Sequence, residues 1–297
     1  MRKHSFKEWL IAVRPWSFPA SAVPVAATLA YLQWAQGTVD WVNGLWALVN
    51  IVLFHAAGNT WSDYYDYRRG VDAADTYGVK TLTGGLFRPA EIRRLSLLLL
   101  ALAAVAGVGL LLRTGLPLLA FGLAGMALSL GYPWLKYHAL GDVDIFFTYA
   151  LLPTLGTSYA ATGAVDFSVL WLAVPIGLIT VAILHSNNTR DMRTDARVSI
   201  RTLAMQLGGP ASVVVYCLEI LLPFAWLLGC AAFGLMPWWA LLAWAALLPA
   251  AGNVRQAVRY FHDGGAALAN LDEFTAKLQL LFGLLLSLSF LIAAWVR

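Results

Sequence analysis

Charged residues and cysteines are scarce in this sequence. Only 12% of its 297 residues are Asp, Glu, Lys or Arg, whereas 60% are hydrophobic and the mean hydropathy is +0.69. Soluble domains carry about 25% charged residues, so this composition excludes an ordinary soluble domain and indicates an integral membrane protein. The two cysteines, Cys217 and Cys230, lie in one apolar segment with no ligand residues at metal-binding spacing. We expect them to be packing residues, with neither a disulfide framework nor a zinc site.

The N-terminal region has few consecutive apolar residues. The basic start MRKHSFKEWLIAV leads into Arg14 and Pro15, which interrupt the apolar run before it reaches the length of a signal-peptide core. We therefore expect no cleaved leader. The rest of the chain has no low-complexity tail or linker, so we predict one membrane-embedded domain over residues 1–297.

Long apolar runs make up most of the chain. A helix needs roughly 20 apolar residues to cross the hydrocarbon core of a bilayer. Nine runs approach that length, near 15–35, 42–60, 95–112, 116–134, 143–162, 167–186, 211–232, 237–253 and 276–296. The sequence therefore predicts an all-α integral membrane protein with nine transmembrane helices and its two termini on opposite sides.

Lysine and arginine are distributed unevenly about these nine segments. If each segment crosses once, all but two of the 20 Lys and Arg residues fall on the side of the N-terminus, the exceptions being Arg113 and Arg297. Short cytoplasmic loops carry the excess of positive charge, so we predict a cytoplasmic N-terminus. The long polar connections at 63–94, 187–209 and 254–275 share that side, and we expect the chemistry there.

An acidic motif, GNTWSDYYDYRRGVD, directly follows the second apolar run. Its residues Asn59, Asp63 and Asp66 are spaced i, i+4 and i+7, which places them on one face if the helix continues through them.

A second acidic motif, HSNNTRDMRTD, follows the sixth apolar run. Asn187, Asp191 and Asp195 are spaced i, i+4 and i+8. The same arrangement at the same end of two spans predicts two pseudo-equivalent halves, about 1–140 and 141–297.

Carboxylates on facing helix ends repel one another and need compensating cations near a membrane. Mg²⁺ suits such a place, because it is usually held by one or two carboxylates together with substrate phosphates. Arginines beside the motifs, such as Arg68 and Arg190, are suited to bidentate phosphate contacts. Each motif alone is also compatible with a solvated helix end and ordinary ion pairs, but the repetition at matched positions favours a shared site.

Taken with RPWSFPASAVP, GYPWLKYHALGD and RTLAMQLG, the two motifs resemble the UbiA-type intramembrane aromatic prenyltransferases. DYYDYRRGVD and NNTRDMRTDARVSIRTLAMQLG are most similar to the 1,4-dihydroxy-2-naphthoate polyprenyltransferase branch of menaquinone synthesis. The resemblance implies nine helices around a central cavity that opens to lipid, in the cell's inner (cytoplasmic) membrane. It also implies Mg²⁺-dependent transfer of a polyprenyl group from an isoprenoid diphosphate to an aromatic acid.

The resemblance further implies roles for individual residues. The metal ligands would be Asp63, Asp66, Asp72, Asp191 and Asp195, with Asp72 the weaker candidate beyond Gly70. The substrate contacts would be Arg14, Asn59, Arg68, Tyr132, Lys136, Asn187, Asn188, Arg190 and Arg201. Two departures stand out, because Ser62 replaces a frequent Asn and ARVSIRTLA replaces a commoner small-Gly-Lys-Arg-Thr-Leu run.

Other functions and substrates also fit parts of the pattern. A secondary transporter would carry charges near the membrane midplane, where only Glu219 is found, and a lipid-binding scaffold would not need the acidic motifs. The candidate acceptors are 1,4-dihydroxy-2-naphthoate, 4-hydroxybenzoate and homogentisate. We expect His55 and His185 to pack between helices, and we expect no nucleic acid and no obligate protein partner.

Overall fold

Helices form nearly all of the regular structure. The computed structural model describes residues 4–70, 80–198 and 200–297, and within these ranges the β-structure is one isolated bridge between His138 and Arg201. The long helices are α2 (Pro19–Gln36), α3 (Trp41–Arg68), α4 (Pro89–Thr114), α5 (Pro117–Lys136), α8 (Leu170–Asp195), α10 (Gly209–Ala232) and α13 (Leu271–Val296). The shorter ones are α1 (Phe6–Val13), α6 (Gly141–Phe146), α7 (Leu152–Thr162), α9 (Leu203–Leu207), α11 (Leu247–Val258) and α12 (Tyr260–Asp263).

The predicted membrane class is confirmed. In the described part of the chain, six helical segments are long and apolar enough to cross a membrane, namely α3, α4, α5, α8 with its preceding turn, α10 and α13. The other three expected spans are helical but less regular. They are α2, a continuous run from α6 through a π-helical turn (Phe147–Leu151) into α7, and a 3₁₀ segment (Trp238–Ala246) that leads into α11. The count of nine crossings stays a prediction.

The expected connection at 254–275 is mostly helical. The structure continues α11 to Val258 and then forms α12 and a 3₁₀ turn before α13 begins at Leu271. Polar composition alone suggested a loop, but an amphipathic helix at a membrane surface has the same composition.

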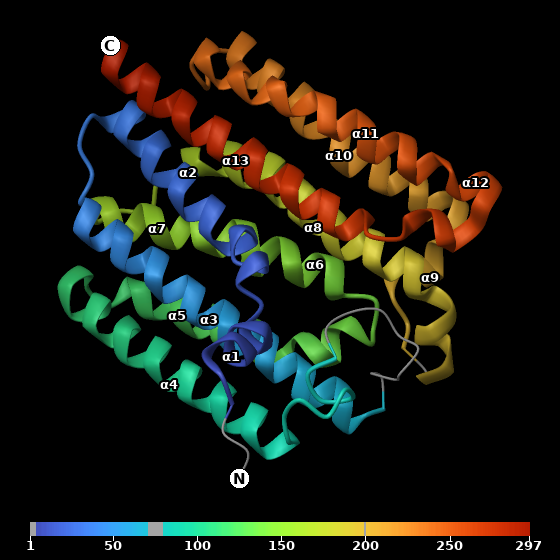
Figure 1. The fold of residues 1–297 in the computed structure, drawn as a ribbon. Helices are drawn as coiled ribbons and strands as arrows, with labels where there is room; N and C mark the ends of the chain where they lie inside the picture. Colours follow the sequence, from blue (N-terminus) through green and yellow to red (C-terminus); the bar gives the residue numbers. More distant parts are fainter. Residues whose placement is uncertain (1–3, 71–79, 199) are drawn as a thin grey trace.

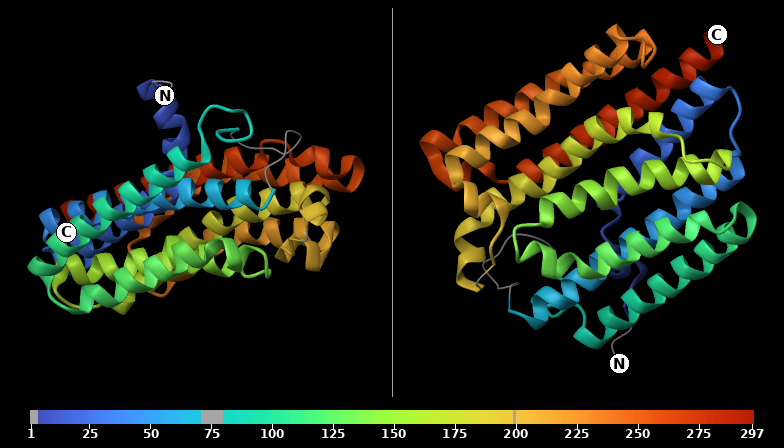
Figure 2. Two further views of the ribbon diagram at one scale, coloured as in Figure 1. Left: turned by 90° about the horizontal axis from the view of Figure 1, so that it is seen from below. Right: turned by 180° about the vertical axis from the view of Figure 1, so that it is seen from behind.

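The helices run back and forth between two ends of the molecule (Figures 1 and 2). The last turns of α3 and α8 lie at the same end as α9 and α12, on the right-hand side of Figure 1, whereas the C-terminus lies at the opposite end. Arg113 and Arg297 belong to that opposite end, where Arg113 Nε donates to Asn43 Oδ1 at 2.7 Å and Arg297 donates to the Trp34 carbonyl at 2.7 Å. The fold therefore brings the two acidic motifs to one end and keeps the two exceptional arginines at the other.

Two apolar clusters hold these helices together. The larger one joins α2, α8, α10 and α13 through fully buried side chains such as Tyr216, Phe282 and Phe290. It also takes in Cys230, with Cys217 packed against its edge, so the thiols are packing residues as expected. The smaller cluster comprises Ala12, Leu82, Phe87 and Ile92, and it fixes α1 and the 80–88 turn beside the end of α3.

The outer surface is strongly apolar. Leu112 is 83% exposed and Trp295 is 88% exposed, and many other large apolar side chains of the outer helices are exposed as well. Exposed apolar surface of this extent is typical of a protein that faces lipid.

The contact between α2 and α13 depends on a glycine. A Cβ atom built on Gly283 would lie 2.1 Å from Val23 Cγ1, and the β-branched valine has little freedom to move away. We predict that Gly283→Ala lowers stability by about 1–3 kcal/mol, measured as a lower thermal unfolding temperature in detergent. Gly229→Ala in α10 is the matched control, because its Cβ would meet nothing within 4 Å. Equal stability of the two variants would contradict this account of the contact.

Candidate active site

The first acidic motif occupies the last turns of α3. The helix continues to Arg68, so Asp63 and Asp66 share a face as predicted, and they are only 4% and 8% exposed. One Asp63 oxygen is ion-paired with the Arg14 guanidinium, and the other accepts a hydrogen bond from Thr81 Oγ1 at 3.1 Å. A carboxylate this deeply buried needs such partners, because its desolvation is costly.

Arg14 reaches Asp63 from an unusual backbone conformation. Its φ of 56° is left-handed, between α1 and a 3₁₀ turn at Pro15–Ser17, and this conformation costs a non-glycine residue about 1–2 kcal/mol. Asn59 holds the turn, since its Nδ2 donates to the Val13 carbonyl at 3.0 Å and to Ser17 Oγ at 2.9 Å. The amide nitrogen of Asn59, which we predicted as a substrate contact, thus positions Arg14.

Asp66 is held by the C-terminal end of α5 and the residue that follows it. Its Oδ1 accepts a hydrogen bond from the Tyr137 hydroxyl at 2.7 Å, and its Oδ2 lies 3.5 Å from Lys136 Nζ. Burial and the Asp66 carboxylate raise the pKa of Tyr137 above its ordinary value, so the phenol stays protonated and donates.

The second acidic motif occupies the end of α8. Arg190 forms a bidentate pair with Asp191, with Nε and Nη2 each 2.9 Å from a different carboxylate oxygen. The same guanidinium donates to Asp272 Oδ1 at 3.0 Å at the start of α13 and also contacts Asn187 Oδ1. Arg190 therefore links the motif to the last helix.

Lys136 lies between the two motifs. The carboxylates of Asp66 and Asp195 both interact electrostatically with its ammonium group, and Asp195 also interacts with Asp66 and Asp191. Asp195 is 9% exposed. Close by, two residues after Lys136, the backbone of His138 pairs with that of Arg201, and this bridge joins the segments that follow α5 and α8. The structure thus brings the two acidic helix ends together around one cation.

The remaining predicted site residues lie at different distances from this centre. Tyr132 is partly buried and interacts with Lys136 and Asp66, so it faces the centre. Asn188 is buried in α8, whereas the Arg68 and Arg201 side chains are exposed. Asp72 lies outside the described residues.

The donor set suits a hard divalent ion. Carboxylate oxygens are the ligands that Mg²⁺ prefers, and those of the four described aspartates gather at one end of the bundle. Within the described ranges, however, no three His, Cys, Asp or Glu side chains already form a metal-ligating group. The acids are instead paired with Arg14, Lys136 and Arg190, which are also the cations that would contact a bound phosphate.

Buried hydrogen-bond networks surround His55 and His185, the two histidines that we expected to pack between helices. His55 contacts Ser21 Oγ through Nδ1 at 2.9 Å and Ser17 Oγ through Nε2 at 3.3 Å. His185 Nδ1 lies 3.1 Å from Asp142 Oδ1 and 3.8 Å from Glu219 Oε1. Both histidines join helices, as expected, but they do so through polar contacts. His185 is also the buried partner of Glu219, the single acid near mid-span.

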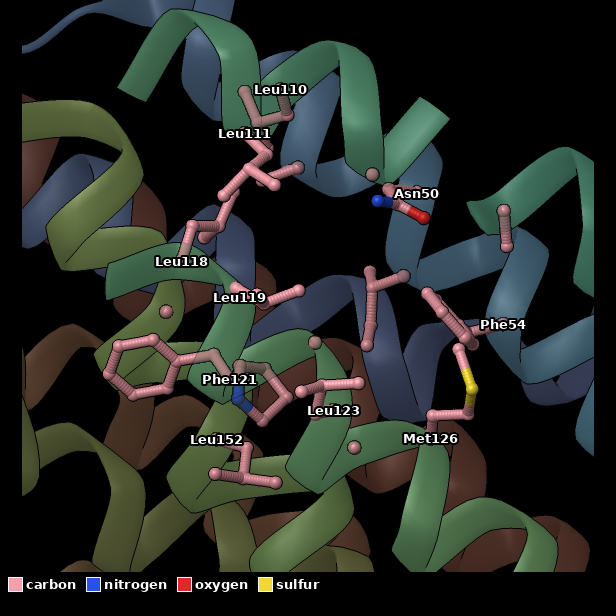
Figure 3. Close-up of a pocket in the computed structure, with 18 of the residues that line it drawn as sticks. Asn50, Phe54, Leu110, Leu111, Leu118, Leu119, Phe121, Leu123, Met126 and Leu152 are labelled. Carbon is pink, nitrogen blue, oxygen red and sulfur yellow. The ribbon is translucent and has the colours of Figure 1, made fainter. Parts of the chain in front are cut away.

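An apolar cavity of about 240 Å³ lies between α3, α4, α5 and α7 (Figure 3). Its walls are mainly Leu, Ala and Gly, with Asn50 and Thr148 among its few polar residues. Leu119 and Leu123 of α5 line it and are 44% and 55% exposed, so the cavity reaches the lipid-facing surface. Thr148 belongs to the π-helical turn between α6 and α7, so the cavity reaches that turn.

Three residues of the centre were not predicted from the sequence. Thr81 and Tyr137 hold the first motif, and Asp272 shares Arg190 with the second. The one available signal was the position of Tyr137 directly after Lys136. The other two come from distant segments whose approach depends on tertiary packing.

Comparisons with known proteins agree with this arrangement. Residues 22–271 match the UbiA prenyltransferase family. The mouse (Mus musculus) UbiA prenyltransferase domain-containing protein 1 is 33% identical over 288 residues, covering 95% of this chain and 83% of the mouse protein. The chicken (Gallus gallus) protein of that name is 36% identical over 222 residues, covering 73% of this chain and 66% of its own length.

Solved structures share the fold. A structure of digeranylgeranylglyceryl phosphate synthase superposes with a TM-score of 0.63 at 16% identity, covering 98% of this chain and 99% of that one. A UbiA homologue from Archaeoglobus fulgidus, bound to GPP and Mg²⁺, gives a TM-score of 0.56 at 13% identity and covers 94% and 99% of the two chains. With the family match across most of the sequence and relatives above 30% identity, these likenesses show that the chain belongs to the UbiA prenyltransferase family.

Proposed function

We propose that this protein transfers a polyprenyl group from an isoprenoid diphosphate to an aromatic acid in a Mg²⁺-dependent reaction. The observation that carries the proposal is the meeting of two acidic helix ends around Lys136 at one end of a membrane bundle. The binding of GPP and Mg²⁺ by a homologue of the same fold supports it.

Some residues of the centre would bind the metal ion, and others would contact the phosphates. Bound Mg²⁺ would neutralise the diphosphate as its bond to the prenyl carbon breaks. The metal ligands would be Asp63, Asp66, Asp191 and Asp195, with Asp72 and Asn188 as further candidates. Arg14, Lys136 and Arg190 would move from carboxylate to phosphate oxygens, and Arg68, Asn187 and Arg201 stay predicted substrate contacts. Tyr132 would hold its ring beside the allylic carbon, where an aromatic face stabilises positive charge.

For the acceptor we propose 1,4-dihydroxy-2-naphthoate, as in menaquinone synthesis, with 4-hydroxybenzoate and homogentisate as alternatives. The support is the likeness of DYYDYRRGVD and NNTRDMRTDARVSIRTLAMQLG to that branch. All three acceptors are planar and acidic, so the shape of the space beside Tyr132 would select among them.

The prenyl chain would occupy the apolar cavity. The cavity touches the π-helical turn at Thr148 and reaches the lipid-facing surface at Leu119 and Leu123 of α5, which are labelled in Figure 3. A chain bound there would keep its diphosphate at the acidic centre and its tail among leucine and glycine residues.

For the topology we propose nine crossings, two pseudo-equivalent halves and an acidic centre that faces the cytoplasm, in the inner (cytoplasmic) membrane of the cell. The excess of Lys and Arg at the end that carries both motifs supports this orientation.

Removing one carboxylate from either motif tests the proposed metal site. We predict that Asp66→Asn and Asp195→Asn each lower prenyl transfer by roughly 100-fold or more. Each change removes a ligand of the metal ion that would stabilise the charge developing on the diphosphate. The measurement is Mg²⁺-dependent labelling of each acceptor by a radioactive polyprenyl diphosphate in membranes. Asp166→Asn, at the opposite end, is the control, and its activity should match the wild type. Wild-type activity in both motif variants would refute the metal site.

Filling the cavity tests the proposed path of the prenyl chain. Gly125 lines the cavity, and a Cβ there would meet nothing within 4 Å, so Gly125→Leu adds bulk to open space. We predict a KM at least about tenfold higher for a long polyprenyl diphosphate, with little change for a short one such as geranyl diphosphate. Gly229→Leu in α10 is the matched control, because its Cβ is equally unobstructed. An equal effect on both chain lengths would argue against this path.

A further inference from the structure

Asp144 is a buried acid with an unused oxygen. It lies in α6, is 4% exposed, and its Oδ1 has no hydrogen-bond partner among the described residues. One turn further on, Thr148 is 8% exposed, and its hydroxyl interacts with the Asp144 carboxylate without forming a well-aligned hydrogen bond. Buried polar groups almost always have partners, so a carboxylate and a hydroxyl that satisfy each other only in part indicate a place that a ligand completes.

Asp144 and Thr148 lie near residues of the acidic centre and of the apolar cavity. Tyr132 of α5 and Tyr149 of the π-helical turn both interact electrostatically with Asp144, and Tyr132 also interacts with Lys136 and Asp66. Thr148 lines the apolar cavity. Asp144 therefore neighbours Tyr132, which itself neighbours the proposed diphosphate site, and Thr148 one turn further on lines the cavity proposed for the prenyl chain.

The local backbone also sets this segment apart. The helix passes directly from α6 into the π-helical turn at Phe147–Leu151, and such turns are frequent at functional sites. Gly177 of α8 lets the segment approach closely, because a Cβ there would lie 2.5 Å from Phe146 Cε2. The close approach fixes the direction in which this part of the helix presents its side chains.

Other titratable groups nearby already have partners. Both ring nitrogens of His55 contact serine hydroxyls, and the ring stacks edge-on against Tyr149 at 4.7 Å. Asp142 and Glu219 both face His185, and Lys136 faces Asp66. Tyr132 and Tyr149 are phenols that hold their protons at neutral pH. Asp142 Oδ2 and Glu219 Oε2 also lack a hydrogen-bond partner, but both acids face His185, whereas no basic side chain of the described residues pairs with Asp144. Among these acids, Asp144 is therefore the one that can take up a proton without breaking an ion pair.

We propose that Asp144 is the base that takes the phenolic proton of the aromatic acceptor, with Thr148 hydrogen-bonded to that oxygen. The proposal rests on the prenyl transfer proposed above. As the acceptor's ring carbon bonds to the prenyl carbon, the carbon–oxygen bond to the diphosphate breaks and its electron pair leaves with the diphosphate. The phenolic proton passes to the Asp144 carboxylate, and the ring becomes a ketone. Loss of carbon dioxide, or of a ring proton to water, from the bonded carbon then restores the aromatic ring, and the ring oxygen takes its proton back from Asp144.

The test compares Asp144→Asn, which keeps the shape but cannot take the proton, with the wild type in intact membranes. We expect kcat for prenyl transfer to fall by roughly 100-fold or more, in the range of general-base catalysis. The KM for the prenyl diphosphate and the Mg²⁺-dependent binding of a non-cleavable prenyl thiolodiphosphate should stay unchanged. Asp263→Asn, an exposed acid of α12, is the control for loss of one carboxylate.

Several results would overturn the role of Asp144. One is a kcat for Asp144→Asn within about threefold of the wild type. Another is loss of thiolodiphosphate binding in that variant, which would place Asp144 in the diphosphate site. A third is an unfolding temperature lowered as far in Asp144→Asn as in Asp144→Ala, together with normal kcat per folded molecule. A wild-type protein that prenylates none of the three acceptors would instead overturn the proposed function.

Discussion

One shared cation connects the two acidic helix ends of this protein. Lys136 interacts with Asp66 of α3 and with Asp195 of α8, two buried acids from helix ends far apart in the sequence. Uncompensated carboxylates would repel one another and lose their hydration as the bundle closes. The positions of α3, α5 and α8 therefore depend on one another.

Each acidic motif also has an arginine of its own. Arg14 pairs with Asp63, and Arg190 forms a bidentate pair with Asp191. Both arginines are held by neighbouring segments, the first through Asn59 and the second through Asp272. Charge compensation is thus distributed over the N-terminal turn, the middle of the chain and the last helix. Under the proposed function, the same pairs keep the acids and cations in place until Mg²⁺ binds the acids and a diphosphate binds the cations.

Local regularity decided which features could be predicted from the sequence. The helical continuation through Asp63 and Asp66 follows from spacing, and the gathering of positive charge at one end follows from counting. The partners of these acids could not be predicted in the same way, since Thr81, Tyr137 and Asp272 come from segments that only tertiary packing brings close. The π-helical turn after Asp144 and the 3₁₀ segment at Trp238–Ala246 were also missed, because an apolar run has the same composition in each type of helix.

The backbone at Arg14 carries a consequence for protein engineering. A left-handed φ of 56° favours glycine or asparagine, so a search for stabilising substitutions guided by backbone energy alone would replace this arginine. Such a change would relax the turn and at the same time remove the cation that faces Asp63. At this position local stability and charge have opposing requirements, and the sequence keeps the charge. Stabilised variants are therefore better sought among the lipid-facing helices than at this turn.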